Sequence, residues 1–170
     1  MTHVVASVGW LGAVAAFLTL AVTAVRTRDL ETQRALYIAM EVMGYTALVP
    51  LSLASFTSGL VQSLGTPWGL LRHWWVIVKL AISLVATAVL LLYIPTLRLL
   101  GAAASSPGLA DDRTLLPSSS PVLHSAAALI VLLVAVVLSV YKPKGLTRHG
   151  WRKQQQGRAE QSQVRVRPAA

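Results

Sequence analysis

Four long apolar stretches, separated by short polar segments, set the pattern of this chain. The first covers residues 4–25 and contains no Asp, Glu, Lys, Arg or His. As a helix it would be about 33 Å long, which matches a bilayer hydrocarbon core of about 30 Å. The others cover about residues 36–62, 73–97 and 122–141. The pattern predicts an all-α membrane protein, a four-helix transmembrane bundle of up-down-up-down topology within residues 1–141.

The segments between the stretches carry turn and charge signals. Residues 26–34 are short and charged, which predicts a tight helical hairpin, and residues 63–69 contain two glycines and a proline, which predict a turn. Residues 101–121 are small, polar and turn-rich, so we expect a flexible loop there. Residues 142–170 form a basic, Gln-rich tail that we expect to be disordered. Pro50 lies inside the second stretch and predicts a kink.

The composition supports a membrane setting. The chain is 55% hydrophobic and only 12% charged, whereas soluble domains carry about 25% charged residues. The net charge of +9 comes from an excess of Lys and Arg, which sets the orientation of a membrane protein in the bilayer. We also expect it to attract the tail to anionic lipid headgroups. Nucleic acid is not an expected partner, because no folded basic domain remains outside the apolar stretches. The absence of cysteine excludes disulfides and thiolate metal sites.

The distribution of basic residues predicts an orientation. Four crossings place both termini on one side of the membrane, together with Arg72 and the basic residues that follow Tyr141. The opposite side carries a smaller set, namely Arg26, Arg28, Arg34, Arg98 and Arg113. Because basic residues concentrate on the cytoplasmic side, we expect a multi-pass protein of the cell membrane with both termini in the cytoplasm.

A polar seam follows one face of the second stretch. Its members recur at steps of four and three and are Glu41, Tyr45, Leu48, Ser52, Ser55, Gly59 and Gln62. Unpaired polar groups in hydrocarbon are costly, so this face should turn inward. Two interpretations stay open: close helix packing with hydroxyls bonded to backbone, or the lining of a small polar cavity. The first stretch has a similar stripe of small and polar residues, Gly9, Gly12, Ala16, Thr19 and Thr23.

Glu41 and His124 are expected in the same leaflet, because each lies near the start of its helix and both helices start on the side of the membrane opposite the termini. A carboxylate beside an imidazole can hold a proton, a metal ion or a hydrogen bond. The alternative is that Glu41 reaches the interface near a helix N-terminus. The candidate intramembrane polar site therefore comprises Glu41, Tyr45, Ser52, Ser55 and His124. Lys79 enters from the other side, on the order of 13 Å away in depth, so it should not pair with Glu41.

A second cluster is expected at the side of the termini, and it comprises His3, Arg72, His73 and Lys79. Its simplest interpretation is an interfacial anchor, because Trp, Arg and Lys favour the headgroup level. His3 and His73 lie at helix ends, where a haem would be half in water. Copper(I) prefers sulfur ligands, which are scarce here. We therefore predict no cofactor, with haem or copper at His3 and His73, or at Glu41 and His124, as the alternative.

Several stretches resemble a known family. Residues 3–12, 58–69, 72–80 and 140–145 resemble a family of predicted four-helix integral membrane proteins of unknown function that is abundant in actinobacteria. This resemblance implies the four-helix fold and no particular activity. Residues 3–12 and 59–80 are also distantly similar to the membrane domains of CopD-type copper-resistance proteins, which would imply copper handling.

The sequence contains no nucleophile–base pair, phosphate loop, zinc helix motif or dinucleotide fingerprint. We therefore expect a non-enzymatic role, as an accessory subunit or a transport-related module of the membrane. Its partners would be the lipid bilayer and either another membrane protein or a second copy of the chain. The alternative function is a haem-handling or metal-handling membrane protein that uses His3 with His73, or Glu41 with His124.

Overall fold

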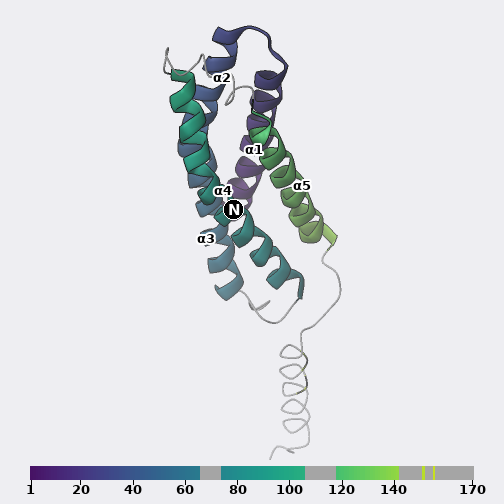
Figure 1. Cartoon of the computed structure of the whole chain (residues 1–170). Coiled ribbons are helices and arrows are strands. Elements are labelled where there is room, and N and C mark those ends of the chain that lie inside the picture. Colours follow the sequence, from purple (N-terminus) through teal and green to yellow (C-terminus); the bar gives the residue numbers. More distant parts are fainter. Residues whose placement is uncertain (66–73, 106–117, 142–150, 152–154, 156–170) are drawn as a thin grey trace, which may run out of the picture.

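Four long apolar helices, packed side by side, dominate the computed structural model, which describes residues 1–65, 74–105, 118–141, 151 and 155 (Figure 1). They are α1 (Thr2–Arg26), the unbroken run of α2 (Leu30–Met43), η1 (Gly44–Leu48) and α3 (Val49–Gly65), then α4 (Trp74–Ser105) and α5 (Ser120–Tyr141). Within these described ranges, all four are long and apolar enough to cross a membrane. The predicted all-α bundle of four apolar helices is therefore confirmed.

The connection between α1 and α2 is shorter than the predicted charged segment. Asp29 ends it by capping α2, because its carboxylate accepts a hydrogen bond of 2.9 Å from the backbone N–H of Thr32 and another from the Thr32 hydroxyl. An aspartate at this position satisfies backbone donors that a helix start leaves unpaired. Gln33 then donates from Nε2 to the carbonyl oxygen of Ala24 at 2.9 Å, which holds the two helix ends together.

Helix α4 continues to Ser105, so the predicted loop from Gly101 is wrong over its first residues. Small residues suggested a flexible segment, but alanine is the strongest helix former. Gly101, Ala103 and Ala104 are buried, because the end of α4 packs against α2. The other predicted connections and the basic tail, residues 66–73, 106–117 and most of 142–170, lie outside the described residues.

A π turn interrupts the second apolar helix just before Pro50. The backbone N–H of Val49 bonds to the carbonyl oxygen of Gly44, five residues earlier instead of four. Proline cannot donate to the carbonyl of Thr46, and its ring would crowd that carbonyl in a regular helix. The wider turn accommodates this local conflict. The irregularity expected at Pro50 is thus a π turn at Gly44–Leu48.

The π turn shifts which residues face the bundle. The buried positions are Gln33, Tyr37, Met40, Gly44, Leu48, Ser52 and Ser55. Downstream of the turn this face agrees with the predicted seam at Leu48, Ser52 and Ser55. Upstream of the turn, each buried residue lies one position earlier in the sequence than the predicted seam residue, because a π turn holds one more residue than an α turn. Met40 and Gly44 therefore take the inner places expected for Glu41 and Tyr45.

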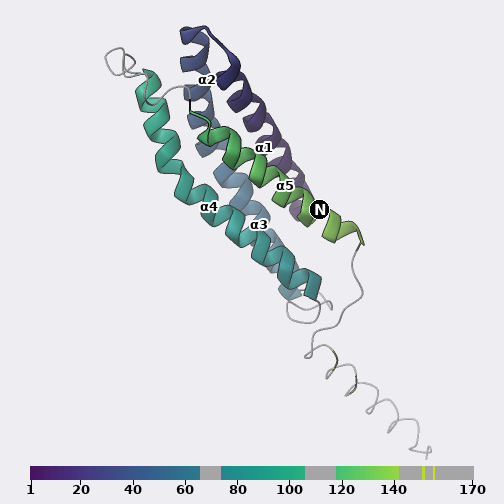
Figure 2. The same ribbon diagram turned by 45° about the vertical axis from the view of Figure 1, so that its right-hand side comes forward.

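The core runs along the length of the bundle, where α1 lies beside α2, α3 and α5 (Figure 2). Its largest members are Trp10, Phe17, Tyr37, Met40, Leu48, Tyr93, Leu97, Leu100 and Leu132. The stripe of small residues expected to pack inward on α1 faces outward instead at Gly12, Ala16, Thr19 and Thr23. The two threonine hydroxyls bond to carbonyls of their own helix at 3.0 Å and 2.8 Å, so they need no neighbouring helix.

Candidate functional site

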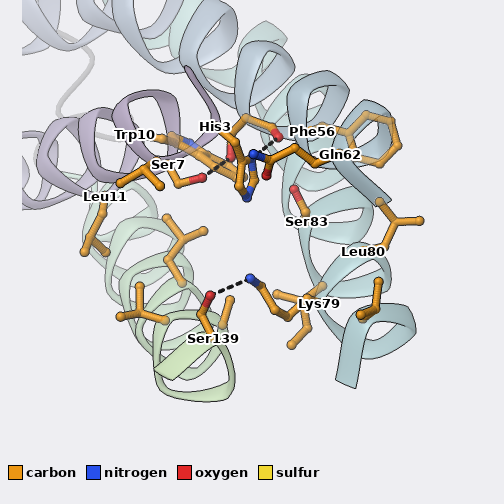
Figure 3. Close-up of a pocket in the computed structure, with 18 of the residues that line it drawn as sticks. His3, Ser7, Trp10, Leu11, Phe56, Gln62, Lys79, Leu80, Ser83 and Ser139 are labelled. Atoms are coloured by element: carbon orange, nitrogen blue, oxygen red, sulfur yellow. Dashed lines mark hydrogen bonds between the residues drawn. The ribbon is translucent and has the colours of Figure 1, made fainter. Parts of the chain in front are cut away.

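A cavity of about 550 Å³ lies between the first turns of α1, the end of α3, the beginning of α4 and the end of α5 (Figure 3). Its polar lining consists of His3, Ser7, Ser55, Gln62, Ser63, Lys79, Ser83 and Ser139. Its larger apolar walls include Trp10, Leu11, Phe56, Trp75 and Leu132. The volume lies within the range of about 300–1,000 Å³ that ligand pockets occupy.

His3 is fixed at the wall between α1 and α3. Its Nδ1 lies 3.1 Å from the carbonyl oxygen of Ser55 and 3.2 Å from the hydroxyl of Ser58. Because a carbonyl oxygen only accepts, Nδ1 carries the hydrogen and donates it to Ser55. Gly59 makes room for the ring, since a Cβ at that position would lie 3.0 Å from Cε1 of His3. The imidazole is thereby oriented, and its Nε2 has no hydrogen-bond partner in the described part of the chain.

Two serines join α1 to α3 beside the cavity. The hydroxyls of Ser7 and Ser55 lie 2.8 Å apart, and Ser55 is only 4% exposed. Ser52, one turn earlier, is fully buried and donates to the carbonyl of Val49 in its own helix at 2.8 Å. The inward orientation predicted for Ser52 and Ser55 is confirmed, and of the two only Ser55 borders the cavity.

Lys79 forms the opposite wall. Its Nζ donates to the hydroxyl of Ser139 at 2.8 Å, which links α4 to α5. The same nitrogen lies 5.9 Å from the ring centroid of Trp75, within the range of a cation–π contact. Figure 3 shows Lys79 and Ser139 on one side of the space and His3 on the other.

The ionisable side chains among the described residues of the lining are Lys79 and His3. Lys79 and His3 are basic, and none of the described residues that line the cavity is Asp or Glu. Both belong to the cluster predicted at the side of the termini, and the structure places both at one cavity. Arg72 and His73, the other members of that cluster, lie outside the described residues.

At the other end of the bundle, two tyrosines fix the start of α5. The backbone N–H of Ser118 donates to the hydroxyl of Tyr37 at 2.8 Å, and this hydroxyl lies 3.2 Å from the carbonyl oxygen of Ser118. The hydroxyl of Tyr93 lies 3.1 Å from that of Ser120. These contacts join α2 to Ser118, just before α5, and α4 to Ser120, the first residue of α5.

His124 belongs to this tyrosine cluster rather than to a site with Glu41. Its ring stacks on Tyr93 with centroids 4.1 Å apart, and its Nδ1 lies 2.9 Å from the carbonyl oxygen of Ser120. Across the described ranges, Glu41 and His124 share no hydrogen bond or ion pair; Glu41 packs against Gly101 of α4. Tyr45 is 43% exposed, so its predicted inward orientation is wrong.

Metal ligation has limited support in the described residues. Among them, no group of three or more His, Asp or Glu side chains could hold a metal ion. The alternative of haem or copper therefore stays an expectation from sequence. Nε2 of His3 is the atom best arranged to bind a metal, because metal-binding histidines are likewise oriented by a hydrogen bond from the other ring nitrogen to a carbonyl oxygen.

Among the polar cavity residues that the sequence analysis does not predict, Ser7 and Ser83 have a signal in the sequence. Ser7 lies four residues after His3, and Ser83 lies four residues after Lys79, so each shares a helix face with a basic residue. Searching each basic residue for polar neighbours one turn away would have found both.

Comparisons of the chain with protein-family models, with curated proteins and with solved structures found no match. The resemblance to the four-helix actinobacterial family and to CopD-type domains therefore has no support beyond the quoted stretches, and it stays a prediction.

Proposed function

We propose that the chain is an integral protein of the cell membrane that crosses the bilayer four times in up-down-up-down order. The outward-facing side chains support this, because many of them are large and apolar. Examples from three different helices are Val5, Val8, Leu91, Leu92, Leu133 and Val137. In water such a surface would favour association, whereas acyl chains solvate it. The excess of basic residues on the side of the termini favours their cytoplasmic placement.

Within that membrane, we propose a non-enzymatic binding module of an accessory or transport-related kind. The cavity carries this proposal, because it brings Lys79 and His3 together among four apolar helices. Ionisable residues inside membrane helices are costly and mark binding sites or pathways. Several hydroxyls complete the lining, and each can donate or accept a hydrogen bond.

The proposed partners follow from the same surfaces. Lipid surrounds the apolar helices, and the basic residues after Tyr141 attract anionic headgroups. Another membrane protein or a second copy of the chain would pack on an apolar helix face. Nucleic acid is not among the proposed partners.

This proposal is tested by identifying the compound that the cavity binds. We would purify the full chain from membranes in mild detergent, extract it and identify bound small molecules by mass spectrometry. Ala135→Phe fills the cavity, whereas Ala127→Phe adds the same ring to an exposed position of the same helix. We expect a compound that copurifies with the wild type and with Ala127→Phe and is lost from Ala135→Phe. Equal recovery from all three proteins would overturn the proposal.

The second candidate is metal or haem handling, and the orientation of His3 is the observation that favours it. With Nδ1–H held by Ser55, Nε2 is available as a ligand. Metal analysis and an absorption spectrum of the purified chain decide between the two candidates. Stoichiometric metal or a Soret band that His3→Gln abolishes would support the second candidate, and a colourless, metal-free protein would remove it.

A further inference from the structure

We propose that the cavity binds an uncharged lipid whose polar end carries a hydroxyl group, and that this hydroxyl donates a hydrogen bond to Nε2 of His3. This inference rests on the proposed function and names the class of its ligand. It follows from the orientation of the His3 ring, from the contacts that already hold Lys79 and from the apolar rim of the cavity.

The His3 ring presents a hydrogen-bond acceptor to the cavity. The ring is neutral, because it is partly buried and the positive charge of Lys79 lies at the same cavity. Its one hydrogen sits on Nδ1, which lies 3.1 Å from the carbonyl oxygen of Ser55, so Nε2 keeps a lone pair. Figure 3 shows the ring projecting into the space, where this lone pair is offered to a ligand.

A ligand must donate a hydrogen to pair with this nitrogen. A hydroxyl group does so, whereas a phosphodiester anion has no hydrogen to give, and a cation would be repelled by Lys79. Lys79 itself donates to the hydroxyl of Ser139 at 2.8 Å and lies 5.9 Å from the ring centroid of Trp75. An uncharged ligand leaves these contacts in place, so the cavity favours a hydroxyl without a charge.

The side chains near His3 suit the oxygen of the same hydroxyl group. Gln62 and Ser83 line the cavity, and Figure 3 shows both on the side of the space where His3 lies. The amide of glutamine and the hydroxyl of serine can each donate to a ligand oxygen. A ligand hydroxyl can therefore donate to His3 and accept from Gln62 or Ser83, which satisfies both its hydrogen and its oxygen.

The rim of the cavity selects a ligand with a long apolar chain. Val4, Val8, Val136 and Val140 line it and are exposed at the outer surfaces of α1 and α5. In the proposed membrane these side chains meet the hydrocarbon, so the cavity is continuous with the lipid. His3 lies in the first turn of α1, and Val8 lies five residues further along, about 7.5 Å deeper. A lipid can thus place its hydroxyl at His3 while its chain extends past the valines.

The experiment compares pairs of probes that differ only in whether the hydroxyl can donate. One pair is dioleoylglycerol and its methyl ether, and the other is decylhydroquinone, kept reduced under nitrogen, and its dimethyl ether. The pairs represent an aliphatic and a phenolic source of the same chemistry. Native mass spectrometry measures the binding of each probe to the full-length chain. The detergent is lauryldimethylamine oxide, because the hydroxyls of a sugar detergent would compete for the cavity.

Two variants identify the acceptor. His3→Phe keeps a ring at the wall of the cavity and removes Nε2. His124→Phe makes the same change at an exposed histidine outside the cavity, where the new ring can still stack on Tyr93. Thermal unfolding shows whether each variant is folded, and the comparison of the two probes of a pair in the wild type needs no variant.

In at least one pair, we expect the wild type and His124→Phe to bind the hydroxyl probe about fivefold or more tightly than its ether, because the ether leaves Nε2 unpaired. His3→Phe should bind both members of that pair equally. A preference in one pair alone identifies the source as aliphatic or phenolic. Equal binding within both pairs by the wild type, or a preference that survives in His3→Phe, would overturn the inference.

These outcomes separate the inference from the proposed function. If the wild type binds a compound that Ala135→Phe loses but does not distinguish a hydroxyl from its ether, only the inference fails. If no compound depends on the cavity, the proposed function fails as well.

Discussion

The carboxylate of Glu41 on α2 lies directly against Gly101 on α4, and a Cβ at position 101 would overlap it. A larger residue at this position would have to displace the end of the Glu41 side chain, so the close approach of that side chain, and not a special backbone conformation, favours glycine there. The contact also explains why α2 and the last turns of α4 pack so closely.

Replacing Gly101 by Ala should destabilise the bundle. The added methyl forces the Glu41 carboxylate aside, and overpacking of this kind costs about 1–3 kcal/mol. Thermal unfolding in detergent would measure it. Gly12→Ala is the matched control, because a Cβ at Gly12 meets no atom within 4 Å. A loss of stability at position 12 as large as that at position 101 would contradict the contact.

The same contact predicts coupling between the two residues. Glu41→Ala removes the atoms that a methyl at position 101 would strike, so the double variant should lose less stability than the sum of the two single changes. Residues in direct contact show such coupling energies of about 0.5–3 kcal/mol. Strictly additive losses in the double-mutant cycle would show that Glu41 and Gly101 do not touch.

Tyr37→Phe should loosen the start of α5. Tyr37 is 1% exposed and its hydroxyl accepts from the Ser118 backbone N–H, so the change leaves that donor unpaired. An unsatisfied group of this kind costs about 1–3 kcal/mol. Tyr45→Phe is the control, because Tyr45 faces outward, and its effect should stay within about 0.5 kcal/mol. Equal unfolding free energies for the two variants would be the contrary result.

The cysteine-free chain allows a direct test of how α1 meets α3. Ser7→Cys and Ser55→Cys together place two thiols where the hydroxyls lie 2.8 Å apart, so mild oxidation should join them. Ser7→Cys with Thr57→Cys is the control pair, because Thr57 faces away from the bundle. Cross-linking is read as a mobility shift that reductant reverses. Efficient cross-linking of the control pair but not of the first would refute the packing.

The Asp29 cap predicts a pH dependence. Hydrogen bonds from the hydroxyl and backbone N–H of Thr32 lower the pKa of the Asp29 carboxyl below its ordinary value of 3.8. A carboxyl with a lowered pKa in the folded state stabilises fully above its unfolded pKa, and this contribution is lost as the pH falls through the folded pKa. Asp29→Asn keeps the capping oxygen and cannot titrate.

The wild type should therefore lose stability relative to Asp29→Asn as the pH falls from about 5 through the lowered pKa of the folded state. Thermal unfolding of both proteins in the same detergent measures this difference, and other acidic groups cancel between them. A difference that stays constant over the whole range would exclude the cap as its origin.

The helices could be predicted from the sequence because their apolar length is a direct physical signal. The inward face of the second helix could not, because α-helical spacing does not hold through the π turn before Pro50. One extra residue in the π turn moved Met40 and Gly44 inward and left Tyr45 outside. Pro50 predicts an irregular helix at this point, but the spacing of the sequence does not say whether the irregularity is a kink or a π turn.

The cavity was foreseen only in part. The sequence predicts His3 and Lys79 as ionisable residues near the same end of the bundle, and Ser55 as part of the polar seam. Their meeting depends on how α1, α3, α4 and α5 pack, which pairwise depth estimates along single helices cannot give. Glu41 and His124 were predicted at a similar depth in the membrane, but they do not lie in one site, because depth does not say which helices are neighbours or which faces meet.

The central claim is that this chain crosses a bilayer four times, and the accessibility of single cysteines tests it most directly. Thr32→Cys and Ser119→Cys lie at one end of the bundle, and Leu64→Cys lies at the other. In intact cells, a maleimide that cannot cross membranes should label the first two, and should label Leu64→Cys only after permeabilisation. Labelling of all three from the same side, or recovery of the chain in the supernatant after detergent-free ultracentrifugation, would contradict the account.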